Sequence, residues 1–387
     1  MKNLRMVITN LLILSVLILG FSVNCAKKTK KIKIGIVGAL TGPQATFGLD
    51  YLNAAKLAVN EANLEGGVLG KNIELVPMDD KADPKEAVSV AHKLVSDPDV
   101  VAVVGYPNSG NALPASKIFH ENMVPLVITA ATNPKITQQG FENLFRICPT
   151  DDIQGPAAAD FAINILKKKN FSLIHDKTAY GQGLAEEFKR KLQMEGCEIV
   201  AYETITEGER DFTAILTRII AKNQEVIYFG GMYPEGGLLL KQAKSLGSKA
   251  IFIMPDGCFD PELIFIAGDA SEDIIVSFLA PPWNEIPNAK DFVKKFQAEY
   301  GELGAFGPFA YDAVNVVIEA IRRTGKSERM AIIKSLQSPD FQIDGITGRI
   351  EFDNNGQVKN KTFYFYTVEN KKFKLFKQIS SEYKTSS

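Results

Sequence analysis

The sequence predicts an α/β fold built from two doubly wound, parallel-sheet lobes that are joined by several hinge crossovers. From about residue 31 onward, short β-rich apolar runs alternate with segments of helical period, as expected for parallel sheets with right-handed crossovers. The alternation occurs twice, once before about residue 149 and once from there to about residue 280. A chain of 387 residues, 45% of them hydrophobic, is long enough for about two or three packing units.

The predicted strands are apolar along their whole length, which is typical of strands buried on both faces of a sheet. They are expected at residues 32 to 38, 73 to 79, 100 to 105, 125 to 130, 171 to 176, 198 to 205, 226 to 231, 250 to 256 and 273 to 280. The segments between them are amphipathic. In the clearest one, Asp83 is expected to cap a helix, Pro84 to occupy its first turn, and Asp97-Pro98 to end it.

The remainder of the chain is less regular and is expected to return to both lobes. It contains helical segments at 288 to 300, 307 to 323 and near 328 to 337, followed by β-like runs at 348 to 353 and 361 to 368. The first lobe is therefore predicted to comprise residues 32–149 and about 281–347. The second is predicted to comprise residues 150–280 and about 348–380, leaving 381–387 as a tail.

The N-terminal residues have the order of an export signal. Lys2 and Arg5 precede an uncharged apolar segment, and Asn24-Cys25 then leads into a lysine-rich spacer. Residues 1–24 are therefore predicted to be removed. Cys25 resembles the acceptor cysteine of bacterial lipoproteins, which makes residues 25–31 a lipidated linker. A soluble secreted product and a single transmembrane anchor over residues 6–26 are the alternatives.

Composition and motifs indicate a protein that is not an enzyme. The 44 Lys+Arg nearly balance the 45 Asp+Glu, which argues against a nucleic-acid-binding surface. The spacing of Gly35, Gly38 and Gly42 is not that of a dinucleotide-binding loop, and residues 324–327 are expected to be a helix C-terminus with a capping glycine. His175 is expected to be a structural histidine. With three His, and four Cys that form no CxxC pair, neither a metal site nor a cofactor is expected.

Loops rich in small hydroxyl and amide residues follow five of the predicted strands. They lie at residues 105 to 111, 129 to 134, 179 to 183, 230 to 237 and 255 to 260. In open α/β sheets, ligands bind outside the carboxyl ends of the strands, where helix N-termini also point. Hydroxyls and free N–H groups suit a small carboxylate, and an acidic side chain suits an ammonium. If the carboxyl ends of the strands in the two predicted sheets face each other, they would form a ligand-binding cleft between the lobes.

At these loops the sequence resembles the type I periplasmic binding proteins of bacterial ABC importers, in the leucine/isoleucine/valine-binding branch. The similarity covers nearly the whole chain after the export signal. It is carried by residues 32 to 48, 58 to 84, 103 to 116, 128 to 137, 174 to 188, 205 to 219 and 228 to 247.

The resemblance implies a set of ligand contacts in which the first lobe holds the α-carboxylate and the second lobe closes over the ligand. Ser109 would bind the carboxylate through its hydroxyl and N–H, and Thr132 through its backbone. The carbonyl of Ala130 and the Thr132 hydroxyl would receive the α-ammonium. Tyr180 would cover the ligand, and Asp256 would neutralise the ammonium.

Three further positions are expected at the site, namely Phe47, Met232 and Asn108, and the first two depart from the family pattern. Met232 stands where the branched-chain binders carry an aromatic residue, and Phe47 where they often carry tyrosine. Asp256 is one methylene shorter than their glutamate. These departures leave the side chain of the ligand open, so aromatic amino acids or amides are alternatives to an aliphatic amino acid.

The resemblance also implies where the protein works and with what. It would be a periplasmic or cell-surface monomer, attached to the membrane through its lipid anchor, that delivers an amino acid to a membrane permease. A ligand-sensing receptor of the same fold is the alternative.

Overall fold

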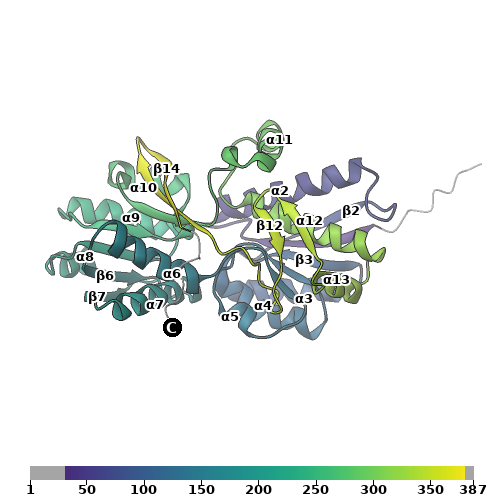
Figure 1. Cartoon of the computed structure of the whole chain (residues 1–387), viewed down its shortest axis with the longest axis horizontal. Helices are drawn as coiled ribbons and strands as arrows, with labels where there is room; N and C mark the ends of the chain where they lie inside the picture. Colours follow the sequence, from purple (N-terminus) through teal and green to yellow (C-terminus); the bar gives the residue numbers. More distant parts are fainter. Residues whose placement is uncertain (1–30, 380–387) are drawn as a thin grey trace, which may run out of the picture. The chain divides into compact units, whose positions relative to one another are not determined.

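The first sheet consists of five parallel strands in the order β2-β1-β3-β4-β5 (Figure 1). The computed structural model describes residues 31–379, and Cys25 and the predicted export signal lie outside this range. The strands are β1 (Ile32–Gly38), β2 (Ile73–Asp79), β3 (Val100–Gly105), β4 (Leu126–Ile128) and β5 (Leu144–Arg146). β5 has no counterpart among the predicted strands, because three residues are too few to produce a periodic pattern.

Helices cover both faces of this sheet. One face packs against α2 (Ala45–Leu64) and α12 (Gly307–Thr324), and the other against α3 (Pro84–Ser96) and α4 (Ser109–Glu121). Successive side chains of β3 point to opposite faces of the sheet, so each face has its own helix layer to pack against. Val104 packs on the α2 side and Val103 on the α3 side. Two shorter helices, α5 (Lys135–Gln138) and α13 (Arg329–Leu336), complete this lobe, which we call the first lobe.

The second sheet has seven strands in the order β14-β13-β10-β9-β8-β6-β7. Five are parallel, and β13 and β14 add an antiparallel ribbon at one edge. The strands are β6 (Asn170–His175), β7 (Glu198–Thr204), β8 (Val226–Gly230), β9 (Ile251–Met254), β10 (Ile275–Phe278), β13 (Phe363–Glu369) and β14 (Lys372–Ile379). The predicted fold class is thereby confirmed, while the ribbon is the one part of this sheet that is not parallel.

Helices cover both faces of the second sheet as well, and together they form the second lobe. α6 (Asp151–Asp160) and α7 (Ala179–Met194) pack on one face. The helices on the other face are α8 (Thr213–Ile220), α9 (Tyr233–Ser245) and α10 (Pro261–Ala267). The connection from β10 to α12 contains α11 (Lys290–Tyr300), and a separate hairpin is formed by β11 (Gln342–Gly345) and β12 (Gly348–Glu351).

Several local expectations are confirmed. Asp83 caps α3 by accepting hydrogen bonds from the backbone N–H groups of Lys85 and Glu86. Gly325 ends α12 in the left-handed conformation at φ 64°, so residues 324–327 are a helix C-terminus. The Nδ1 atom of His175 accepts a hydrogen bond from the backbone of Lys177, which is a structural role. In residues 31–379, no helix is both long and apolar enough to span a membrane.

Within the described chain, three connections run between the lobes, at residues 147–150, 279–306 and 352–362. The first and third are hydrogen-bonded to each other at Arg146, whose backbone N–H donates to Gly356 and whose carbonyl accepts from Val358. The buried Arg146 guanidinium donates to Gln357 Oε1 at 2.6 Å, and Gln357 Nε2 donates to the Cys148 carbonyl at 2.7 Å. The residue ranges assigned to the lobes stay a prediction.

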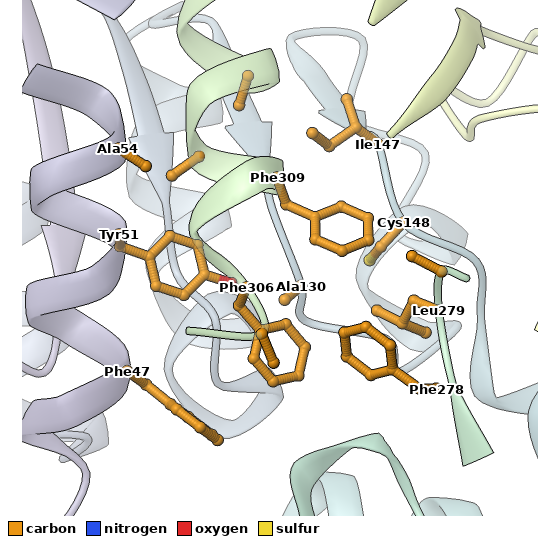
Figure 2. Close-up of a cluster of buried hydrophobic side chains, with 14 of the residues drawn as sticks. Phe47, Tyr51, Ala54, Ala130, Ile147, Cys148, Phe278, Leu279, Phe306 and Phe309 are labelled. Carbon is orange, nitrogen blue, oxygen red and sulfur yellow. The ribbon is translucent and has the colours of Figure 1, made fainter. Parts of the chain in front are cut away.

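An apolar cluster surrounds these connections (Figure 2). Ile147 and Cys148 come from the first connection and Leu279 from the second, and they pack beside Phe278 and Phe309. Phenylalanine rings bury large areas, so this cluster stabilises the connections as well as the lobes.

Replacing Arg146 by methionine is expected to lower the free energy of unfolding by about 3 kcal/mol or more. The change leaves Gln357 Oε1 and the carbonyls of Ala131 and Asn133 without their buried donor. Urea unfolding measures the difference. Arg218→Met is the control, because the exposed Arg218 to Glu203 ion pair should contribute less than about 1 kcal/mol. Equal losses in the two variants would contradict the structural role of Arg146.

Candidate functional site

A cavity of about 380 Å³ lies where the loops of the two sheets meet. Its size is within the range of small-molecule sites. It is lined from the first lobe by Gln44, Phe47, Tyr51, Ala82, Pro84, Pro107, Asn108, Ser109, Gly110, Asn111, Ala130 and Phe306. From the second lobe it is lined by Lys177, Thr178, Ala179, Tyr180, Glu207, Met232, Asp256 and Gly257.

Seven of the eight residues predicted for the ligand site line this cavity. They are Phe47, Asn108, Ser109, Ala130, Tyr180, Met232 and Asp256. The eighth, Thr132, is fully buried and does not line the cavity. It follows Ala130 by two residues in the same loop, and its hydroxyl has no hydrogen-bond partner within residues 31–379.

Ser109 is placed at the cavity by the end of β3. Gly105 and Tyr106 adopt positive φ angles of 139° and 53°, which turn the chain sharply after the strand. A side chain at Gly105 would lie 2.3 Å from the carbonyl of Val37, so only glycine fits. Ser109 then begins α4, where free backbone N–H groups and the helix dipole favour a negatively charged group.

The loop containing Thr132 is tied to both Ser109 and the lobe connection. The backbone N–H of Asn133 donates to Ser109 Oγ at 3.2 Å. The Arg146 guanidinium donates to the carbonyls of Ala131 at 3.0 Å and Asn133 at 2.7 Å. These contacts hold the carbonyl and N–H groups of the loop in fixed positions beside the cavity.

Asp256 brings a buried carboxyl to the opposite wall. It begins the short 3₁₀ helix η2 (Asp256–Cys258), which follows β9 directly. Its Oδ1 atom accepts hydrogen bonds from the Tyr180 hydroxyl at 2.7 Å and from Gln154 Nε2 at 2.8 Å. Burial raises the pKa of Asp256 to about 6, and the hydrogen bonds from Tyr180 and Gln154 oppose that rise.

A second buried carboxyl, Asp151, lies close to the first. It begins α6 immediately after the first lobe connection, and its backbone N–H donates to the Thr132 carbonyl at 3.1 Å. Within residues 31–379, neither of its carboxyl oxygens has a hydrogen-bond partner. Burial raises its pKa well above the usual value, and the positive charge of Arg146 opposes part of that rise.

The lobes also contact each other directly around the cavity. Asn133 Nδ2 donates to the Ala179 carbonyl at 2.6 Å, and the Tyr233 hydroxyl donates to the Pro43 carbonyl at 2.6 Å. The rings of Phe47 and Tyr233 meet edge to face with centroids 5.1 Å apart. The lobes therefore touch around the cavity. The N-terminus of α4 bounds the cavity on the first lobe, and the Asp256 carboxyl bounds it on the second lobe.

Comparison with known proteins identifies the family. A family model described as "periplasmic binding protein" matches residues 31–373. The chain belongs to the periplasmic binding protein family. Leu/Ile/Val-binding protein homolog 1 of Brucella abortus is 36% identical over 336 residues, which cover 87% of this chain and 90% of that protein. The leucine-, isoleucine-, valine-, threonine-, and alanine-binding protein of Pseudomonas aeruginosa is also 36% identical, over 87% of this chain and 89% of its own.

Solved structures agree with this assignment. A leucine-binding protein from Thermotoga maritima superposes with a TM-score of 0.85 at 30% identity, covering 90% of this chain and 99% of that one. A branched-chain amino acid transporter substrate-binding protein from Streptococcus pneumoniae, solved in complex with isoleucine, gives 0.84 at 31% identity, covering 91% and 100%.

This periplasmic binding protein has site residues that the sequence analysis did not single out. Gln154 holds Asp256 but lies in a helix over 100 positions earlier, and no local pattern links the two. Tyr51 could have been found, because it follows Phe47 by four residues on α2 and so shares its face. Phe306 precedes α12 and completes the aromatic wall, with its ring centroid 5.1 Å from that of Phe47.

Replacing Asp256 by asparagine is expected to stabilise the unliganded protein at neutral pH. Because the folded pKa of about 6 exceeds the usual 3.8, the folded state binds more protons, and wild-type stability falls as the pH rises between these values. The neutral amide still offers an oxygen to Tyr180 and Gln154. The variant should match the wild type near pH 4 and gain roughly 2 kcal/mol by pH 7, measured by urea unfolding.

The control for this measurement is Asp152→Asn, which changes an exposed acid in the same lobe. At pH 7 the gain from Asp256→Asn should exceed the effect of Asp152→Asn, because only Asp256 is buried. A gain for Asp256→Asn that does not depend on pH would contradict the raised pKa.

Proposed function

We propose that the protein is the extracytoplasmic substrate-binding component of an ABC importer, and that it binds an aliphatic, branched-chain-like amino acid between its lobes. The observation that carries this proposal is the polarity of the cavity. Ser109 at the start of α4 suits the α-carboxylate, and the buried Asp256 suits the α-ammonium. The proposal extends to this chain what the printed names of its relatives say of those proteins.

The remaining contacts follow from the same placement of the ligand. The Ala130 carbonyl would accept a hydrogen bond from the ammonium, while the Tyr180 ring covers the ligand from the second lobe. Thr132 is buried outside the cavity, so its predicted direct contact with the ligand is not part of this proposal. Phe47 and Met232 are apolar neighbours for an aliphatic side chain, and Asn108 borders the same wall. An amino acid would therefore meet complementary groups from both lobes.

Closure of the lobes would be coupled to binding because the two charged ends of the ligand contact different lobes. A ligand shifts an equilibrium between open and closed forms only when it makes additional contacts in the closed form. The ammonium also supplies the positive charge that favours ionised Asp256. A carboxylic acid without an ammonium would leave this carboxyl without a counter-charge, which favours amino acids over simple aromatic acids.

Asp256→Asn should weaken the binding of leucine, isoleucine and valine by at least about 2 kcal/mol, roughly 30-fold in Kd, as measured by calorimetry. The variant retains the hydrogen bonds to Tyr180 and Gln154 but loses the negative charge that pairs with the ammonium. Undiminished affinity would exclude the proposed role.

Asp312→Asn is the matched control for binding. Asp312 is also a fully buried carboxyl with a pKa raised by burial to about 6, and it accepts hydrogen bonds from Ile346 and Thr347 away from the cavity. Its replacement should leave the amino acid affinity unchanged even if it lowers stability.

We also propose that Cys25 carries a lipid anchor that holds the protein at the membrane. The cysteine follows the apolar segment of the predicted export signal, and the lysine-rich spacer then leads to β1. Cys25→Ser should move the processed protein from the membrane fraction to the soluble fraction, as followed by fractionation and immunoblotting. Retention of the variant in the membrane fraction would exclude lipidation as the anchor.

A further inference from the structure

Two side chains that line the cavity form a hydrogen bond from one lobe to the other. Gln44 immediately precedes α2 in the first lobe, and Glu207 follows β7 in the second lobe. Gln44 Nε2 donates to Glu207 Oε1 at 3.4 Å. Gln44 is buried and Glu207 is exposed, so the contact lies where the cavity meets solvent. Because its partners belong to different lobes, this contact exists only while the lobes are together.

The first-lobe end of the contact is fixed beside the proposed carboxylate site. Asn108 Nδ2 donates to Gln44 Oε1 at 2.7 Å, and Asn108 directly precedes Ser109 at the start of α4. With its oxygen held by Asn108, the Gln44 amide presents its N–H group to the second lobe. Hydrogen bonds therefore run without a break from the start of α4 through Gln44 to Glu207.

Glu207 lies among other acidic side chains. Although the side chain is exposed, the loss of part of its hydration at the cavity raises its pKa to about 7. The negative charges of Asp176, Glu235 and Asp83 add to that rise. Asp83 caps α3 in the first lobe, so closure of the lobes brings acids of both lobes toward each other.

An uncharged N–H donor suits this position. The amide of Gln44 donates to Glu207 whether or not that carboxyl is ionised, whereas an acid in its place would add a like charge. Lys177 also lines the cavity, but its Nζ atom donates to the Thr206 hydroxyl at 3.2 Å. Gln44 is therefore the first-lobe group that compensates Glu207 when the lobes meet.

We propose that Gln44 and Glu207 form a latch between the lobes, which sets how tightly the protein holds any amino acid that closes them. This inference rests on the proposed function, because it requires a ligand that brings the lobes together. A contact made only in the closed form raises the affinity for every such ligand by the same factor. A contact with the ligand side chain would instead favour one ligand over another.

Gln44→Glu tests the latch. The glutamate keeps an oxygen for Asn108 and stands at the start of α2, where the helix dipole favours negative charge, but it places a carboxylate against Glu207. Calorimetry on the full chain at about pH 8 should show that leucine and valine each bind about tenfold more weakly. Thermal unfolding of the unliganded variant checks that it folds.

The same substitution should be nearly harmless in a Glu207→Gln background. There an amide N–H again faces a carboxylate, with the two groups exchanged between the lobes, so the loss should be less than about threefold. Glu203→Gln is the matched control background, because Glu203 lies on β7, pairs with Arg218 and does not line the cavity. In that background Gln44→Glu should still cost about tenfold.

The pH dependence gives a readout that a packing defect would not change. Lowering the pH from about 8 to about 5.5 should reduce the loss caused by Gln44→Glu, because protonated Glu207 can donate a hydrogen bond to the new carboxylate. Asp256 also titrates in this range, but its contribution is common to the variant and the wild type. The ratio of their dissociation constants therefore reports on the latch.

If Gln44→Glu does not fold, Glu207→Ala decides the result, because it removes the acceptor from the exposed end of the latch. Leucine and valine should then each bind about threefold more weakly, and unchanged affinity would overturn the latch.

Two further outcomes would overturn the inference and leave the proposed function intact. One is a tenfold loss for Gln44→Glu that persists in the Glu207→Gln background. The other is a loss that differs by more than about threefold between leucine and valine, which would indicate a contact with the ligand. Failure of the wild type to bind leucine, isoleucine or valine would instead overturn the proposed function, so the two proposals fail in distinguishable ways.

Discussion

The arrangement of the site depends on a buried carboxyl that is held by neutral donors. Asp256 receives its side-chain hydrogen bonds from Tyr180 and Gln154, and burial raises its pKa. Hydrogen bonds fix the position of the carboxyl but do not supply the positive charge that would compensate its ionised form. The unliganded protein therefore retains a group that is better matched to a cationic ligand than to its own surroundings, and this mismatch is what a bound ammonium relieves.

The lobe connections link this carboxyl to the opposite wall of the cavity. Arg146 ends the first sheet, joins two of the connections through Gln357, and braces the carbonyls on either side of Thr132. Asp151 begins the second lobe a few residues later and contacts the Thr132 backbone. The residues that position the first-lobe loop therefore belong to the segment about which the lobes would move. The hydrogen bonds that fix the loop are thus made by the same residues that join the lobe connections.

Sequence periodicity and loop chemistry were sufficient to predict most of the fold and much of the candidate site. Buried parallel strands give apolar runs, and the loops after them contain residues of the cavity wall. The resemblance to a known family then singled out Ser109 and Asp256 within those loops. β5 was missed because it is too short for periodicity, and β14 because a strand of mixed polarity depends on its pairing with β13. Gln154 was missed because its partner is distant in the sequence.

What the sequence determined by itself is the succession of elements and the kinds of residue at the ends of the strands, since both depend on interactions between near neighbours along the chain. Only the tertiary structure decided which of these residues share a cavity, that Thr132 does not line it, and that Gln154 holds Asp256. Burial, pKa and hydrogen-bond satisfaction depend on atoms brought together from distant segments, and no local pattern specifies them.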